Sequence, residues 1–194
     1  MHNVTVAFAA LLVMLLSYFF GCFNGSFMVS HFIIRDDVRK HGSGNAGLTN
    51  FYRTYGAKYA LLVIACDMGK TVAACLLGSF FFRCLGWDGT LGTLLAGLGC
   101  ELGHIFPVFY GFRGGKGILS GGTLVLLLNW RVAAVAWALF LLLWLTTRYV
   151  SLASITATCS APITVYFVYA HNWLYTGLCL AVAALVVWCH RENI

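Results

Sequence analysis

Residues able to bind a phosphate are concentrated in a glycine-rich segment that runs from His41 to Arg53. Its glycines free the backbone to present N–H groups, its Ser, Asn and Thr side chains add donors, and Arg53 supplies a two-pronged guanidinium. The spacing Gly42-x-Gly44-x-x-Gly47 also matches a dinucleotide fingerprint, but no parallel β-α-β unit surrounds it. The segment therefore indicates either an anion site or a glycine-rich interfacial turn that caps the next helix. The candidate binding residues are Gly42, Ser43, Gly44, Asn45, Thr49, Asn50 and Arg53.

A second candidate anion site follows the motif Gly103-His104-Ile105-Phe106-Pro107. There the chain reads Phe112-Arg113-Gly114-Gly115-Lys116-Gly117 and then enters an apolar run. A Gly-Gly-Lys-Gly turn that opens a helix, with an arginine just before it, has the components of a phosphate or oxyanion cradle. The same residues also suit a flexible basic turn at a membrane surface, and both interpretations stay open. The candidates here are His104, Gly114, Gly115 and Lys116.

Ionisable residues also occur inside apolar runs. Asp67 and Lys70 are three residues apart, so they share one face of a helix and can pair. An ionisable residue within a membrane segment is a functional candidate by default, yet a structural pair that supports the site explains these two better than catalysis does. Glu101 lies at a comparable depth and could share Lys70 or face a wet cavity. His104 could instead be an interfacial ring with a satisfied hydrogen bond.

The elements that position these residues must lie in a membrane. Of the 194 residues, 61% are apolar and only 9% are charged. A soluble domain is nearer half apolar and a quarter charged. The composition therefore excludes a soluble enzyme, a disordered regulator and a nucleic-acid binder, despite the net charge of +6. The eight cysteines lie mostly in apolar runs without a C-x-x-C pair, and we expect buried thiols rather than disulfides or metal ligands.

Runs of about 20 apolar residues without the alternation of barrel strands predict transmembrane helices. We expect an all-α integral membrane protein with seven transmembrane helices in a single domain, residues 1–194. As one helix, 118–147 would rise roughly 45 Å, well beyond a membrane core of about 30 Å. We therefore divide it at Trp130, with a single tilted helix as the alternative. The expected spans are 4–34, 58–82, 89–110, 118–129, 130–147, 149–170 and 173–189.

Basic residues set the orientation of these helices through the positive-inside rule. With the N-terminus outside and the C-terminus cytoplasmic, nine of the 12 Lys and Arg residues lie on the inner side, two lie outside, and Lys70 lies within a helix. Four polar parts of the chain then meet at the inner face: the segments 35–57 and 111–117, the hydroxyls of 146–154 and the C-terminal residues 190–193. The first apolar run has no basic residue before it, so we expect an uncleaved helix rather than a signal peptide.

These motifs together resemble those of a known family, the bacterial acyl-phosphate:glycerol-3-phosphate acyltransferases of the PlsY type. The resemblance rests on 42–53 and 103–117, and it extends almost over the whole chain in the right order. Further matches are Asp67-x-x-Lys70, Tyr149-x-Ser151-Leu152 and the ending His190-x-x-Asn193-Ile194. The departures are Cys22, Thr71 and Glu101, where relatives usually have Ser, Gly and an apolar residue.

The resemblance implies an enzyme of the bacterial inner membrane whose active site faces the cytoplasm. It implies transfer of a fatty acyl group from acyl phosphate, and not from acyl-CoA, to the sn-1 hydroxyl of glycerol 3-phosphate. The products are lysophosphatidate and phosphate, in phospholipid biosynthesis. The implied catalytic residues are Ser43, Lys116, His190 and Asn193. The implied substrate-binding residues are Gly42, Gly44, Asn45, Thr49, Asn50, Arg53, His104, Gly114, Gly115 and Ser154.

An acyl phosphate is already activated, so we expect catalysis by positioning and by the charges of Arg53 and Lys116. No Ser-His-Asp arrangement is visible, which favours direct attack, with His190 or a phosphate oxygen of the donor as the base. We expect no metal or other cofactor, because no cluster of carboxylates or His has ligand spacing. The expected partners are both substrates, membrane lipid and the soluble enzyme that supplies acyl phosphate, with no nucleic acid. We expect a monomer.

The main alternative is a transporter for anions or organophosphates, because it would need a similar basic cavity at the inner face. Inverted repeats and broken helices at the midplane would favour it. No convincing repeat is visible, and the polar motifs lie at one face. A CDP-alcohol phosphotransferase is excluded because its Asp-rich helix motif is missing.

Overall fold

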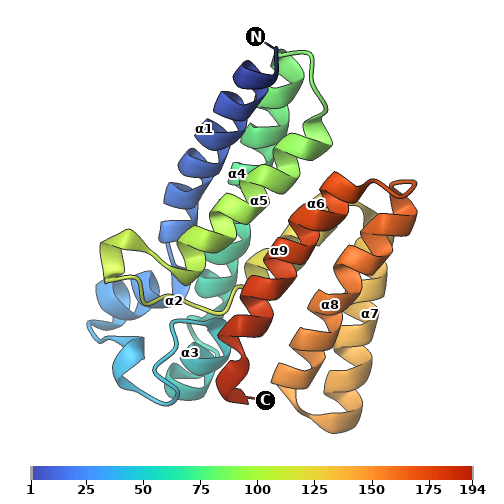
Figure 1. Cartoon of the computed structure of the whole chain (residues 1–194). Helices are drawn as coiled ribbons and strands as arrows, with labels where there is room; N and C mark the ends of the chain where they lie inside the picture. Colours follow the sequence, from blue (N-terminus) through green and yellow to red (C-terminus); the bar gives the residue numbers. More distant parts are fainter. Residues whose placement is uncertain (1, 194) are drawn as a thin grey trace.

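The computed structural model describes residues 2–193, and over this range the chain is all-helical (Figure 1). Ile194, the last residue of the C-terminal motif, lies outside the described residues. Within the described range, five helical segments are long and apolar enough to cross a membrane, and two apolar helices are shorter. The α-helices are α1 (His2–Cys22), α2 (Gly25–Met28), α3 (Leu48–Tyr55), α4 (Ala60–Cys84), α5 (Gly89–Ile105), α6 (Ile118–Leu128), α7 (Trp130–Thr147), α8 (Val150–Val168) and α9 (Trp173–Cys189).

Helices α1, α4 and α5 form one tightly packed group because glycines let their backbones approach. A Cβ atom on Gly99 would overlap the carbonyl oxygen of Met14 in α1, and one on Gly103 would overlap that of Tyr18. Small residues at such spacings allow close helix contact. The close contacts at Gly99 and Gly103 fix α5 against α1.

The first apolar run forms the expected span, 4–34, but it is not one continuous α-helix. The chain leaves α1 at Phe23 and Asn24, forms α2, and continues as a wider π-helical segment, Val29–Ile34. The buried Asn24 side chain accepts a hydrogen bond from the Phe27 N–H at 2.9 Å and donates one to the Ala46 carbonyl at 2.9 Å. The break therefore gives Asn24 a partner in the glycine-rich segment, and hydropathy alone does not reveal that contact.

Residues 118–147 form two helices, as predicted, with the break at Asn129. Asn129 has extended dihedral angles, and its side-chain oxygen caps α7 by accepting the Arg131 N–H at 2.9 Å. Figure 1 shows α7, α8 and α9 as a second group beside α1, α4 and α5, and α6 packs between the two groups, against α4, α5 and α7. It also shows α2, α3 and the C-terminus at one end of the molecule. The expected meeting of the polar segments at one end is thus confirmed.

Candidate active site

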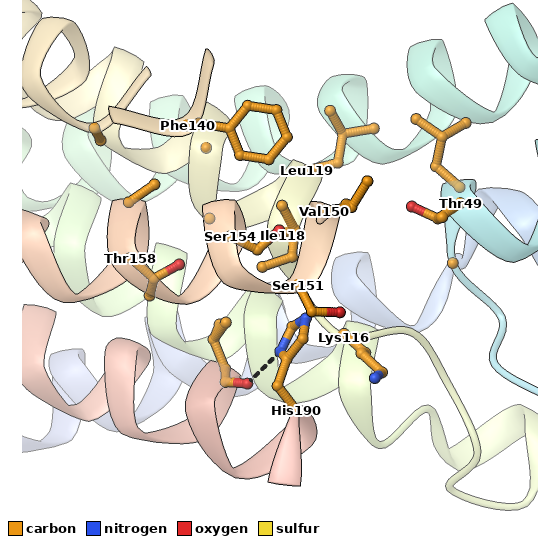
Figure 2. A pocket seen from close by; sticks show the side chains of 18 of the residues that line it. Thr49, Lys116, Ile118, Leu119, Phe140, Val150, Ser151, Ser154, Thr158 and His190 are labelled. Atoms are coloured by element: carbon orange, nitrogen blue, oxygen red, sulfur yellow. Dashed lines mark hydrogen bonds between the residues drawn. The ribbon is translucent and has the colours of Figure 1, made fainter. Parts of the chain in front are cut away.

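A cavity of about 490 Å³ lies where the polar segments meet, and its walls come from 43–53, α6, α7, α8, α9 and the C-terminal residues. Figure 2 shows Lys116, Ser151, Ser154 and His190 around its polar part. Its polar lining side chains are Ser43, Asn45, Thr49, Asn50, Arg53, Asp67, His104, Lys116, Arg148, Tyr149, Ser151, Ser154, Thr158, His190 and Asn193. The structure therefore brings together the ten predicted site residues that have side chains. The four predicted glycines do not line the cavity.

Asn50 organises the glycine-rich segment from within. Its side-chain oxygen accepts the Ser43 N–H at 3.0 Å, and its amide group donates to the carbonyls of Val38, His41 and Asn45 at 3.0 to 3.1 Å. Gly42 has φ +55°, and a Cβ atom there would overlap the Asn50 side-chain oxygen. Asn50 thus uses its polar atoms on the loop backbone, and its contribution is to hold Ser43 and Asn45 at the cavity.

Gly114 and Gly115 pack against the end of α5 instead of forming an open cradle. Their N–H groups donate to the carbonyls of Ile105 and His104, each at 3.1 Å. A Cβ atom on Gly115 would overlap the His104 Nε2 atom. The expectation that these two N–H groups bind an anion is therefore wrong, because α5 carbonyls already occupy them. The glycines thus pack the loop that carries Lys116 against the end of α5.

The backbone of Ala46 connects the two glycine-rich loops. Ala46 is fully buried, its N–H donates to the Gly114 carbonyl at 3.2 Å, and its carbonyl accepts from Asn24 at 2.9 Å. Each bond joins segments that are far apart in the sequence. The two loops that carry Ser43 and Lys116 are thereby fixed relative to each other.

The predicted pairing of Asp67 with Lys70 is confirmed. Their oxygen and nitrogen atoms are 2.8 Å apart, and both side chains are almost fully buried. Asp67 also accepts the Gly25 N–H at 3.0 Å, and Lys70 donates to the carbonyls of Gly21 and Phe23 at 3.1 and 3.2 Å. The pair thus joins the end of α1 and the start of α2 to α4, which is a structural role.

His104 belongs to the same buried cluster. Its Nδ1 atom is 2.7 Å from the Lys70 Nζ atom and 3.6 Å from the Asp67 oxygen. An ammonium group can only donate, so Nδ1 is the acceptor and the proton of the neutral ring lies on Nε2. The distance to Asp67 is too long for a hydrogen bond. Lys70 therefore fixes the tautomer of a histidine that lines the cavity.

Glu101 is buried next to the first turn of α6 but does not line the cavity. A Cβ atom on Gly117 would overlap one of its carboxyl oxygens, and one on Gly121 would lie 3.2 Å from the other. Neither oxygen has a hydrogen-bond partner among residues 2–193. Glu101 therefore fills the space that the two glycines leave. The expectation that it shares Lys70 is not met by any ion pair in the described chain.

His190 has a defined tautomer as well. Its Nδ1 atom is 2.7 Å from the Val186 carbonyl oxygen, which can only accept, so Nδ1 carries the proton and Nε2 is an acceptor. Burial lowers the pKa of His190, and the positive charge of Lys116 acts in the same direction, while the bond to Val186 opposes them. Burial thus favours a neutral ring whose free nitrogen can take a proton.

The C-terminal segment and α8 contribute further polar groups. The side-chain amide of Asn193 donates to the Ser151 hydroxyl at 2.8 Å, which ties the chain end to α8. One turn further along α8, Ser154 lines the cavity, and its buried hydroxyl has no hydrogen-bond partner in the described part of the chain. Ser154 can therefore donate to, or accept from, a bound substrate.

Three cationic side chains line the polar part: Arg53, Lys116 and Arg148. Burial lowers the pKa of Lys116, while the nearby Cys189 and Glu192 oppose that shift. Asp67 is the only carboxylate among the described lining residues, and its negative charge is paired with the positive charge of Lys70. In the sequence, Arg148 serves only as a topology signal, although its place between two helices at the polar end also indicates a phosphate contact. The cavity mouth is therefore suited to phosphate groups.

The cavity continues from this mouth into an apolar interior between α6, α7, α8 and α9. Figure 2 shows Phe140 on this side of the cavity. The sequence does not reveal this interior, because its small and apolar residues are of the same types as those of any packed helix. The apolar lining residues beyond the mouth are Leu124, Val125, Ala136, Trp137, Phe140, Ala157, Ala161, Cys179, Val182, Ala183 and Val186.

Comparison with known proteins decides the family. Residues 11–194 match the family described as glycerol-3-phosphate acyltransferase. The chain belongs to this family. The glycerol-3-phosphate acyltransferase of Syntrophomonas wolfei is 39% identical over 186 residues, which cover 96% of this chain and 91% of that protein. The acyltransferase of Finegoldia magna is 37% identical over 178 residues, which cover 91% of this chain and 86% of that protein.

Solved acyltransferase structures share the fold. PlsY (YgiH), an integral membrane glycerol 3-phosphate acyltransferase, aligns in its glycerol 3-phosphate form with a TM-score of 0.82 and 35% identity, over 95% of this chain and 89% of that one. Its lysophosphatidic acid form aligns with a TM-score of 0.80 and 34% identity. The resemblance found in the glycine motifs is confirmed, and the chain is an integral membrane enzyme that acylates glycerol 3-phosphate in phospholipid synthesis. The transporter alternative finds no support in these comparisons.

Proposed function

We propose that this acyltransferase takes its acyl group from acyl phosphate and transfers it to the sn-1 hydroxyl of glycerol 3-phosphate. The observation that carries the proposal is the two-part cavity, in which a cationic mouth leads into an apolar interior. Glycerol 3-phosphate needs only the mouth, whereas an acyl phosphate needs both parts at once. The products would be lysophosphatidate, which has the same two-part character, and inorganic phosphate.

The cations at the mouth come from three segments, which suits two phosphate groups that must bind together. Arg53 lies in α3 with Ser43 and Thr49 nearby in sequence, Lys116 precedes α6, and Arg148 lies between α7 and α8. Guanidinium groups bind phosphate through two parallel hydrogen bonds. In a partly buried site, Lys116 would stabilise the charge that develops as phosphate leaves. We assign Ser43, Asn45, Thr49 and Asn193 to substrate positioning at this mouth.

The acyl transfer proceeds by direct attack in this proposal. The sn-1 oxygen bonds to the acyl carbonyl carbon, the bond from that carbon to the phosphate oxygen breaks, and inorganic phosphate leaves. The hydroxyl proton passes to the free Nε2 atom of His190 and from there to the leaving phosphate. A phosphate oxygen of the donor is the alternative acceptor. Since the Nδ1 atom of His190 donates to a backbone carbonyl, this ring is not held by a carboxylate as in a Ser-His-Asp triad.

The enzyme would cross the bacterial inner membrane seven times as a single domain, residues 1–194, with the N-terminus outside and the C-terminus in the cytoplasm. The two shorter apolar helices, Ile118–Leu128 and Trp173–Cys189, supplement the five long segments in this arrangement. The excess of basic residues at the end that holds the cavity supports a cytoplasmic site. We expect a monomer that receives acyl phosphate from a soluble enzyme.

An assay of the purified protein tests the donor and the site together. The protein is given glycerol 3-phosphate with either lauroyl phosphate or lauroyl-CoA, and lysophosphatidate is measured. We expect product from the acyl phosphate alone. The variant Lys116→Met should lower kcat/KM by about 100-fold or more, the usual cost of losing a group that stabilises developing charge.

Lys58→Met is the matched control, because Lys58 lies over the Tyr59 ring and does not line the cavity. It should behave like the parent. Product from lauroyl-CoA alone would refute the proposed donor. Equal activity of the Lys116 and Lys58 variants would refute the proposed site.

A further inference from the structure

The apolar interior of the cavity ends at a closed layer of side chains. The deepest lining residue on each surrounding helix is Val125 in α6, Ala136 in α7, Ala161 in α8 and Cys179 in α9. All four are buried and belong to one apolar cluster. We call these four residues the cavity floor.

The layer beyond the cavity floor is tightly filled. One turn further along each helix lie Leu128, Val132, Val165 and Tyr175, which are between 0% and 9% exposed. The Tyr169 hydroxyl donates to the Leu128 carbonyl at 2.8 Å, and its ring packs on Tyr175 with centroids 5.3 Å apart. A chain that reaches the cavity floor therefore meets a packed core rather than an opening.

The depth of the interior can be measured along two helices. Val150 at the mouth and Ala161 at the floor are eleven residues apart in α8, as are Cys179 and His190 around α9. At a rise of 1.5 Å per residue, this is about 16 Å. Carbon–carbon bonds of about 1.5 Å that meet at about 111° advance about 1.25 Å per carbon, so an extended chain of about 13 carbons spans this depth.

We propose that the cavity floor sets the longest acyl chain that the enzyme accepts. The proposal rests on the proposed function, because the occupant is the acyl group of the donor. Ala136 and Ala161 determine the specificity for acyl-chain length. They have the smallest side chains of the cavity floor, and they contact the end of the channel from two different helices. Larger side chains at these positions would shorten the channel.

Ala136→Leu and Ala161→Leu test this inference. The variants are assayed with acyl phosphates from octanoyl to stearoyl, and kcat/KM is measured for each length. A methylene that can no longer be buried costs about fourfold in kcat/KM. If leucine excludes two or three methylenes, the longest substrates that the parent accepts should lose about 15-fold to 60-fold in kcat/KM relative to octanoyl phosphate.

Ala138→Leu is the matched control, because Ala138 lies in the same helix, is exposed on the outer side and does not line the cavity. It should keep the parent's profile of chain lengths. Normal activity of the two floor variants with octanoyl phosphate would show that they fold. The reverse substitution, Val125→Ala, should raise the relative rate with the longest substrates.

Two results separate the failure of this inference from the failure of the proposed function. If the parent produces no lysophosphatidate from any acyl phosphate, the proposed donor is wrong, and the floor has no role in such a reaction. If the parent is active but both leucine variants lose the same factor at every chain length, or none, the cavity floor does not set the limit.

Discussion

Lys70→Met would leave the Asp67 carboxylate buried without its charge partner. The two side chains are 4% and 2% exposed, so water cannot replace the missing ammonium. Lys70 also donates to the carbonyls of Gly21 and Phe23 and to His104, and these groups would lose their donor. Removing one partner of a buried pair typically costs about 3–5 kcal/mol of unfolding free energy.

That loss can be expressed as a melting temperature. For a domain of 150–250 residues, each kcal/mol corresponds to about 2–4 °C. Lys70→Met should therefore lower the Tm by about 6–20 °C. The Tm is measured on the purified protein in detergent micelles, and activity below the transition is recorded alongside it.

The double variant Asp67→Asn/Lys70→Met supplies the decisive comparison. It removes both charges, and the side-chain amide oxygen introduced at this position can still accept the N–H of Gly25, which lies 3.0 Å from the Asp67 oxygen in the parent. Replacing a buried pair as a whole is often close to neutral, so the double variant should regain at least half of the lost Tm. A Tm drop under about 2 °C in the single variant, less than the loss of about 1 kcal/mol would cause, or equal drops in both variants, would show that the buried charge is not the cause.

Four further predictions concern the loops and the mouth of the cavity. Gly117→Ala should lower the unfolding free energy by about 1–3 kcal/mol, because Gly117 has φ +81° and a Cβ atom there would overlap Glu101. Adding Glu101→Ala should restore only the part of this loss that is due to the overlap, and the Tm values of the two variants measure that part. Asn50→Ala should raise the KM for glycerol 3-phosphate at least about tenfold, because several loop hydrogen bonds of about 1 kcal/mol each are lost; an unchanged KM would contradict this role. Because burial lowers the pKa of His190 and a protonated Nε2 cannot accept, kcat/KM should fall with acid only below pH 6.5. The residual activity of Lys116→Met should fall at a higher pH than the parent's, since that variant lacks a charge that lowers the His190 pKa.

The sequence predicts those features of the fold that depend on local composition. Apolar runs identify the helices, and the length of 118–147 predicts a break at Trp130, which the structure places one residue earlier, at Asn129. The charge count predicts that the polar segments meet at one end. These features follow from the membrane's thickness and from the cost of burying charge, which act on every stretch of the chain separately.

The features that escape prediction depend on contacts between distant segments. Asn24 interrupts the first apolar run because its amide reaches Ala46, and the N–H groups of Gly114 and Gly115 are occupied because α5 carbonyls lie within reach. The Asn50 side chain has donor and acceptor groups that could bind a substrate, yet these polar atoms form hydrogen bonds with the loop backbone. The residue type determines which bonds a side chain can form, whereas the fold determines which partners lie within reach.

The backbone of Ala46 has a consequence for the thermodynamics of substrate binding. Flexible loops lose conformational entropy when they close on a ligand, and this loss weakens affinity. Here, Asn24 and Gly114 hold Ala46 from two sides, so the loops that carry Ser43 and Lys116 are already ordered before any phosphate arrives. The mouth of the cavity is therefore preorganised, and the favourable contacts with a small polar substrate are retained as affinity instead of being used to order the protein.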